Sequence, residues 1–448
     1  METDNSVLDI SVNDDIQQAE EWSRERHKYA NKIVHEGTRK QLNHYIPLNI
    51  QLWSDAPEVE EFTTDLAIEL WGKSPKKRHN HLRVVLMNLW DTWNKDPTRY
   101  IAYQRNNSHY PKIPSRYNPV HITKLLILIM DALINAELIE HNIGKYNVEY
   151  SMGYVSKCRA TPDFIDRMVD YGIEPSMVCL HPGTELIQLR SKKSVKHTGN
   201  GNIVKTKGVL LGYQDTPETV QKRGFLHAYN AFIRQHDIRV PALPIPDSKE
   251  VFRVFNNRSW DEGGRFTGGW WMGAKNNTRK DIMINGQPTL ELDYGCCMPS
   301  LMYAQRGIEP LGDIYQIDGF NREIVKIAFM RAINNKGKGR AINSLKKAIQ
   351  KEYPELEDLV DCEALMERIV DQHLFISDLF FQKYGNFLMS LESDICELIL
   401  KTLTSEGICC LSIHDSFIVQ KVYERRLRKV MVESFRQIMD VPYTPLIK

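Results

Sequence analysis

A tight turn followed by an acidic residue constrains the fold of this chain more than any other feature of the sequence. Asn285-Gly286 separates two apolar runs between Asp281 and Asp293, which predicts a β-hairpin with a two-residue type I′ turn. Pro288 has no amide hydrogen, so its nitrogen should face an unpaired side of the strand ladder. A helix-like run follows Asp293 at once. The hairpin therefore presents the Asp293 carboxylate at the end of a strand, where a metal ion could bind.

A second carboxylate in a similar setting lies about 120 residues later in the chain. Residues 408–413 read as a buried strand, His414-Asp415-Ser416 as a turn, and 417–419 as another strand. Between the two aspartates, residues 322–351 carry nine Lys or Arg and one Glu. Two strand-borne carboxylates separated by a basic helical segment are typical of two-metal phosphoryl transfer.

The composition sets broader limits. The chain has 448 residues, 42% of them hydrophobic and 26% charged, which is ordinary for a globular protein of two to four domains. A net charge of +1 excludes no class of partner. The eight cysteines include no Cys-x-x-Cys pair, so neither a zinc site nor a disulfide framework is indicated and reduced thiols are expected.

The sequence gives no indication of membrane insertion or export. The first twenty residues are acidic and polar, unlike a signal peptide. The most apolar run, residues 122–134, contains Lys124 and Asp131 and is too short to cross a bilayer. We therefore expect a cytoplasmic protein with no membrane partner.

The N-terminal part resembles a DNA-binding domain. Residues 1–73 are expected to be a helical lead-in. Residues 74–178 show a helix over 82–93, a basic and aromatic loop that includes 99–105 and Arg116, a helix over 120–136 and two short strands. This order, and the junction at Lys157-Cys-Arg159, resemble winged helix-turn-helix regulators and plasmid-type replication initiators. The resemblance implies contacts of these basic residues with duplex DNA. The alternative is an accessory helical domain whose basic loop is merely solvated.

Residues 179–249 are interpreted as a connecting or thumb-like region. The polar, basic tract 191–201 reads as a mobile loop or a wide hairpin turn. A helix over 216–235 should begin with Thr216 as N-cap and Pro217 in the first position. The prolines between 241 and 246 indicate a domain boundary, so 250–448 forms the chemical half of the chain.

A glycine-rich stretch near the start of that half indicates a surface for nucleic acid. Residues 263–273 contain five glycines, Arg265, Trp270 and Trp271. Glycines permit close backbone approach, and tryptophan rings can stack on bases. A phosphate-cradling loop is a further reading, but no lysine-serine pair follows, so a P-loop is not indicated.

Residues 260–420 resemble the superfamily of family A DNA polymerases and phage-type single-subunit RNA polymerases. Leu292-Asp-Tyr294 resembles motif A, Arg322-x-x-x-Lys326 resembles motif B, and Ile413-His-Asp-Ser-Phe417 resembles motif C. Gly264-Arg265-Phe266 resembles the element that contacts the primer–template minor groove, and Gly312-Asp-Ile-Tyr315 resembles the start of the fingers. The motifs occur in the family's order.

The resemblance implies an α+β fold: a polymerase-like palm with an antiparallel sheet and helical fingers, preceded by the winged helix-turn-helix-like domain. Asp293 and Asp415 would hold two Mg²⁺ ions, or Mn²⁺ in their place, with the Tyr294 carbonyl as a further ligand. Arg322 and Lys326 would bind the triphosphate and assist catalysis. Arg265 and His414 would contact the template and primer DNA, and nucleoside triphosphates would be the second substrate.

Two departures from the family leave the product open. Met298 stands where relatives select the sugar, and Asn334-Asn335 stands where they carry a Tyr-Gly pair that stacks on the template base. DNA synthesis is slightly favoured. No exonuclease carboxylate set is recognisable, so no proofreading is expected.

Two alternatives remain. A small RNA polymerase or primase is favoured by His414-Asp-Ser-Phe417. It is disfavoured by Asp293-Tyr294 and by Met298, because phage-type enzymes have glycine at the latter position. A winged-helix replication initiator or regulator with an inactive palm is disfavoured by the retention of both aspartates and of Arg322 and Lys326. A winged helix joined to a small polymerase would suit a mobile element.

Overall fold

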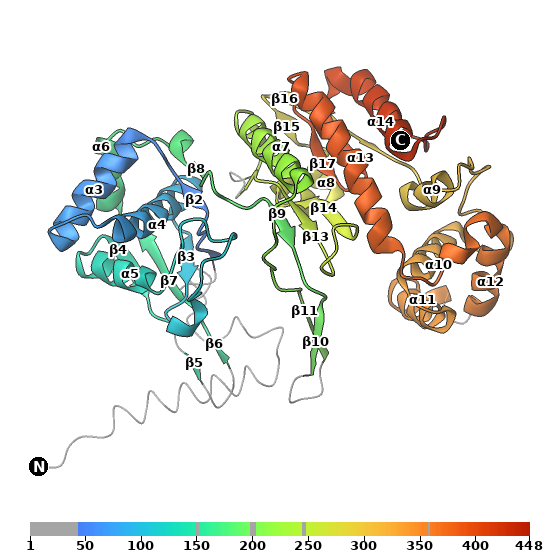
Figure 1. Ribbon diagram of the computed structural model, residues 1–448, viewed down its shortest axis with the longest axis horizontal. Coiled ribbons are helices and arrows are strands. Elements are labelled where there is room, and N and C mark those ends of the chain that lie inside the picture. The colour runs from blue at the N-terminus through green and yellow to red at the C-terminus, as the bar shows by residue number, and fades with distance from the viewer. Residues whose placement is uncertain (1–43, 145, 148–151, 198–202, 244–247, 357–358) are drawn as a thin grey trace, which may run out of the picture. The chain divides into compact units, whose positions relative to one another are not determined.

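The computed structural model describes residues 44–448, except 145, 148–151, 198–202, 244–247 and 357–358. The chain divides into two compact units, Met1–Glu185 and Leu186–Lys448, which are treated separately below. Both contain helices and mostly antiparallel strands, so the protein is α+β as predicted (Figure 1).

In the part of the N-terminal unit that the structure describes, four helices accompany a four-stranded sheet. The sheet has the order β1-β3-β7-β4, and only the β1–β3 pair is parallel. The helices are α3 (Pro57–Trp71), α4 (Lys76–Lys95), α5 (Leu125–Asn135) and α6 (Pro162–Asp170). The strands are β1 (Tyr45–Pro47), β3 (Tyr100–Tyr103), β7 (Ser156–Ala160) and β4 (Ile139–Asn142). Residues 82–90 of α4 are all buried, so this helix runs through the core of the unit.

The structure of this unit differs from the prediction in three respects. The stretch 99–105, expected to be a loop, contains β3, which is a central strand because it pairs with both β1 and β7. The lead-in 1–73 is not wholly helical, since β1 and β2 (Leu52–Trp53) precede α3; residues 1–43 lie outside the described residues. β2 pairs with β8 (Cys179–Leu180), so the unit extends past the expected boundary at 178.

The C-terminal unit is built on two sheets. One has the order β12-β15-β16-β18-β17 and the other β14-β13-β9. The first comprises β12 (Ile238–Arg239), β15 (Met283–Ile284), β16 (Gln287–Asp293), β18 (Ser416–Gln420) and β17 (Leu411–Ile413). The second comprises β14 (Gly263–Thr267), β13 (Phe252–Phe255) and β9 (Ile187–Leu189). Strands β10 (Ser194–His197) and β11 (Ile203–Thr206) pair antiparallel, so part of the tract 191–201, expected to be a mobile loop or a wide hairpin turn, is a strand; residues 198–202 lie outside the described residues.

Helix α13 (Gly385–Ser405) joins the elements of this unit. It packs against β14, α7 (Pro217–Arg234), α9 (Cys297–Ala304) and α14 (Glu424–Met439). Three further helices lie beside α9 and one end of α13 (Figure 1). They are α10 (Arg322–Asn334), α11 (Lys338–Glu352) and α12 (Cys362–Gln372).

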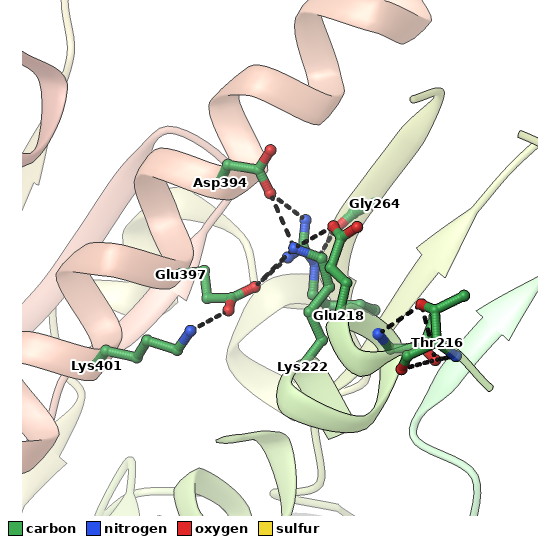
Figure 2. Close-up of polar contacts among 9 residues, drawn as sticks. Thr216, Glu218, Lys222, Gly264, Asp394, Glu397 and Lys401 are labelled. Carbon is green, nitrogen blue, oxygen red and sulfur yellow. Dashed lines mark hydrogen bonds and ion pairs between the residues drawn. The ribbon is translucent and has the colours of Figure 1, made fainter. Parts of the chain in front are cut away.

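A buried charge cluster fixes α13 to β13 and α7. Arg253 on β13 is fully buried, ion-pairs with Glu397 and Asp394 of α13, and donates to the Gly264 carbonyl at 2.7 Å. Figure 2 shows Lys222 of α7 and Lys401 of α13 completing the cluster. Burial alone would raise the pKa of Glu397, but the surrounding cations outweigh it and leave this pKa below its ordinary value.

Residues 186–249 therefore belong with the rest of the C-terminal unit. β9 pairs with β13, β12 pairs with β15, and α7 packs on α13. Contrary to the expectation of a separate region 179–249, this segment is divided between the two units at residue 185. The domain boundary expected near 241–246 falls inside the C-terminal compact unit, and residues 244–247 lie outside the described residues. The helix over 216–235 is confirmed, with Thr216 as its N-cap and proline in its first position.

Candidate active site

The predicted hairpin is confirmed and places Asp293 at the end of a strand. Ile284 pairs with Gln287, and the two residues between them have φ of 51° and 72°, as a type I′ turn requires. Along β16, the ladder with β18 ends with Asp293 opposite Ser416. Asp415 precedes Ser416 in the turn between β17 and β18, and its carbonyl accepts a hydrogen bond from the Tyr294 amide at 3.3 Å. The backbone of one strand pair thus brings the two aspartates together.

Two further carboxylates near this point are already neutralised. Glu291 receives two hydrogen bonds of 2.9 Å from the guanidinium of Arg279 and one of 2.6 Å from the Ser416 hydroxyl. Glu392, from α13, receives two bonds of 2.7–2.8 Å from Arg265. Within the described chain, neither Asp293 nor Asp415 has an ion-pair partner. Of four neighbouring acids, two are therefore left with their charge uncompensated.

Burial raises the pKa of both aspartates and also that of Glu392, which rises to about 7 although Arg265 opposes the shift. Burial, together with the charges of Asp415 and Glu291, raises the pKa of Asp293 to about 6, although Lys326 and Lys448 oppose the shift. Burial also raises the pKa of Asp415. The Oδ1 atom of Asp293 is buried and has no hydrogen-bond partner. A buried, unsatisfied carboxylate oxygen is unfavourable unless a cation or a proton compensates it.

The two aspartates fit Mg²⁺ better than a metal that needs a complete protein cage. No group of three or more His, Cys, Asp or Glu side chains among the described residues is arranged to hold a metal. Mg²⁺ commonly takes one or two carboxylates and completes its shell with water and substrate phosphates. The uncompensated pair and the orphaned Oδ1 atom are consistent with that kind of site.

Helix α10 carries two cations toward this region. Arg322 opens the helix and binds Asp313 through two hydrogen bonds of 2.5 and 3.1 Å. Lys326 lies one turn later, is exposed, and has no ion pair with any described residue. Its charge favours the ionised forms of both Asp293 and Asp415. Lys326 can thus bind an anion directly, whereas an anion must displace Asp313 to bind Arg322.

Three predicted contact residues are buried. Trp271 is fully buried and donates through Nε1 to the Ser412 carbonyl at 3.1 Å, so its ring cannot stack on a base as expected. Trp270 is only partly buried. Tyr294 is 2% exposed, and its hydroxyl donates to the Met431 carbonyl. Only the backbone of Tyr294 remains available to the site. Met298 is 8% exposed within α9 and offers little surface to a sugar.

Other predicted residues lie at the margins of the site. His414 is exposed, with φ of 59°, in the turn that carries Asp415. Arg265 is 25% exposed in its side chain and approaches the aspartates through its pair with Glu392. Asn334 ends α10, and its side-chain amide donates to the Met330 carbonyl one turn earlier.

The basic residues predicted to bind DNA in the N-terminal unit have partners within that unit. Lys157, predicted to contact DNA at the wing-to-helix junction, is 4% exposed, and its Nζ atom lies 4.3 Å from the ring centroid of Tyr45, so it offers little surface to a phosphate. Arg159 pairs with Glu140 at 2.7 Å, and Arg116 pairs with Glu185 at 3.1 Å. A phosphate would have to displace a carboxylate to reach either arginine.

Sequence reasoning missed Arg279, Glu392 and Lys448, which lie near the two aspartates or pair with the acids beside them. Arg279 pairs with Glu291, and Glu392 provides the carboxylate that pairs with Arg265. Lys448 is joined to Asp293 by backbone hydrogen bonds. None belongs to a recognisable motif. Their roles depend on contacts across the fold, so no local signal could have found them.

Comparison with protein families found none that matches this chain, and comparison with curated proteins found no match. Among the helices in the described part of the chain, none combines the length and apolar character needed to cross a membrane. Function must therefore be argued from the site itself.

Proposed function

We propose that the protein is a template-directed nucleotidyltransferase that extends a nucleic-acid primer with nucleoside triphosphates, with DNA synthesis favoured. The observation that carries this proposal is the contrast among the four acids. Arginines pair with Glu291 and Glu392, whereas Asp293 and Asp415, at adjoining strand ends, have no ion-pair partner among the described residues. The order of the motif-like segments along residues 260–420 and the antiparallel sheet that bears both aspartates also support a polymerase-like palm.

Asp293 and Asp415 would hold two divalent ions, Mg²⁺ or Mn²⁺, with the Tyr294 carbonyl as a further oxygen ligand. The chemistry that such ions supply is activation of the attacking 3′-hydroxyl and neutralisation of the phosphates. Lys326 and Arg322, one turn apart on α10, would bind the phosphates and stabilise charge on the departing pyrophosphate. The Arg265–Glu392 pair would position the strand β14 beside the aspartates and so orient the primer terminus.

Primer extension tests the proposal. Labelled dNTPs and NTPs are offered with Mg²⁺ on primed and unprimed single strands, because the buried Met298 gives no clear basis for choosing the sugar. Asp293→Asn and Asp415→Asn should each lower incorporation on the order of 100- to 1000-fold, as loss of a group that stabilises developing charge does.

Asp281→Asn provides a matched control, since Asp281 is an exposed aspartate at the start of the same hairpin. Full activity of either active-site variant would refute the proposal. Incorporation of NTPs alone, without a primer, would identify an RNA polymerase or primase instead.

A further inference from the structure

A pocket of about 400 Å³ is lined by Gly295 and Cys296, which closely follow Asp293 in the chain. It is bounded by the start of α9, the first residue of α10 and the segments 309–314 and 443–448. The residues that matter here are Gly295, Cys296, Asp313, Arg322, Thr444 and Lys448. The pocket therefore lies between the strand that bears Asp293 and the helix that bears Arg322.

The backbone holds Lys448 directly against Asp293. The Asp293 amide donates to the Lys448 carbonyl at 3.1 Å, and the Lys448 amide donates to the Asp293 carbonyl at 2.9 Å. The Gly295 amide donates to the Leu446 carbonyl at 2.7 Å. These three bonds add the segment 446–448 to the edge of residues 293–295, so the position of Lys448 is as well defined as that of the aspartate.

The side chain of Lys448 crosses Gly295 and enters the pocket. A Cβ atom placed on Gly295 would lie 3.4 Å from Lys448 Cε, so a larger residue at 295 would crowd the lysine. The charge of Lys448 acts on Asp293, Cys296 and Asp313 together. Lys448, Cys296 and Asp313 all line the same pocket.

The lining of the pocket suits an anion with several oxygen atoms. Lys448 is exposed and has no ion pair in the described part of the chain. Arg322 is paired with Asp313, so an anion would have to displace this carboxylate to bind the arginine. Lys448 requires no such displacement. The Thr444 hydroxyl is buried without a hydrogen-bond partner, and the N-terminus of α9 faces the same space. Glu309 is the acid in the lining that no described cation neutralises.

We propose that Lys448 is a substrate-binding residue that contacts the phosphates of the incoming nucleoside triphosphate beside Arg322. This inference deepens the proposed function and rests on it. A lysine ammonium is a compact point charge with three donors, which suits phosphate oxygens that approach from more than one direction. A residue that served only as a counter-ion of Asp293 would change turnover without changing the affinity for polyphosphate.

Steady-state kinetics separates these two roles. Lys448→Gln should raise the KM for the triphosphate on the order of tenfold, the loss expected for one charged hydrogen bond, and leave kcat within about twofold. Lys448→Arg should restore most of the affinity. Lys429→Gln, an exposed lysine on α14, is the control, and thermal unfolding verifies that each variant folds. A fall in kcat with unchanged KM would overturn the proposal in favour of the counter-ion role.

Alkylation of Cys296 gives a readout that does not depend on catalysis. Cys179 and Cys296 are the two partly exposed cysteines of the eight, so a Cys179→Ser background leaves Cys296 as the accessible thiol. Inorganic tripolyphosphate and dATP should each slow its reaction with a maleimide, and Lys448→Gln should remove that protection at the same concentration. Equal protection of both proteins would overturn the proposal.

The combined results also separate this inference from the proposed function. Lys448-dependent protection without incorporation that depends on Asp293 and Asp415 would refute the polymerase and retain a polyphosphate site. Incorporation that depends on the aspartates, with KM and protection unaffected by Lys448→Gln, would refute the role of Lys448 and retain the polymerase.

Discussion

Replacing Asp293 by asparagine should make the metal-free protein more stable at neutral pH while it destroys activity. The pKa of Asp293 rises from an ordinary value of 3.8 to about 6, mainly through burial. That difference in pKa means that the ionised form of Asp293 destabilises the folded protein by at most about 3 kcal/mol. Because the group is only half-buried, solvent screening reduces the expected effect to about 1–2 kcal/mol. Asparagine has the same shape and carries no charge.

The pH dependence follows from the direction of this shift. A carboxyl with a raised pKa binds its proton more tightly in the folded protein, so its contribution is favourable below pH 3.8 and is lost as the pH rises toward 6. The advantage of Asp293→Asn over wild type should therefore be absent near pH 3.8, grow up to pH 6 and remain constant above it. Urea denaturation in EDTA at a series of pH values measures this difference.

Asp313→Asn is the control with the opposite sign. Its pair with Arg322 lowers the pKa of Asp313, so removing that charge should destabilise the protein at neutral pH. Mg²⁺ should stabilise wild type and have little effect on Asp293→Asn. An Asp293→Asn protein less stable than wild type at pH 8 in EDTA would refute the reasoning.

Three further predictions concern stability. Arg253→Met should lower the free energy of unfolding by about 3–5 kcal/mol, because it leaves Glu397 buried without its main partner; urea denaturation checks this, and an unchanged midpoint would contradict it. Burial lowers the pKa of His81 to about 4. The free energy of unfolding of the N-terminal unit should therefore fall by up to about 3 kcal/mol as the pH falls from 6.5 to 4. His81→Gln should remove most of this pH dependence in urea denaturation. Gly286→Ala should cost about 1–2 kcal/mol because φ is +72° there, with lower activity from a displaced Asp293; thermal unfolding and primer extension test the two effects.

Local features of the fold could be predicted from the sequence because their causes lie within a few residues. The Asn285-Gly286 turn requires positive φ at both positions, and Asn-Gly supplies it at low cost. Thr216 and Pro217 begin α7 for equally local reasons. The turn at Asp415 follows from two short apolar runs that cannot continue as one strand without burying His414 and the aspartate.

Features that depend on distant packing could not be predicted. Arg265 and Glu392 are 127 residues apart and meet only because α13 packs on β14. Trp271 lies among glycines, which is compatible with either an exposed or a buried ring, and the contact with β17 decides in favour of burial. Lys157 lies on a strand whose central position became evident only with β3 beside it.

The pairing of Asp293 with Ser416 gives the two aspartates a shared vulnerability. Successive residues of a strand point to opposite faces, so a slip of one residue between β16 and β18 would turn Asp293 away from Asp415. No rotamer change could recover the lost geometry. Damage to the hairpin should therefore abolish the site as a whole and not weaken it gradually. Any chemistry at these carboxylates depends on the correct alignment of β16 with β18.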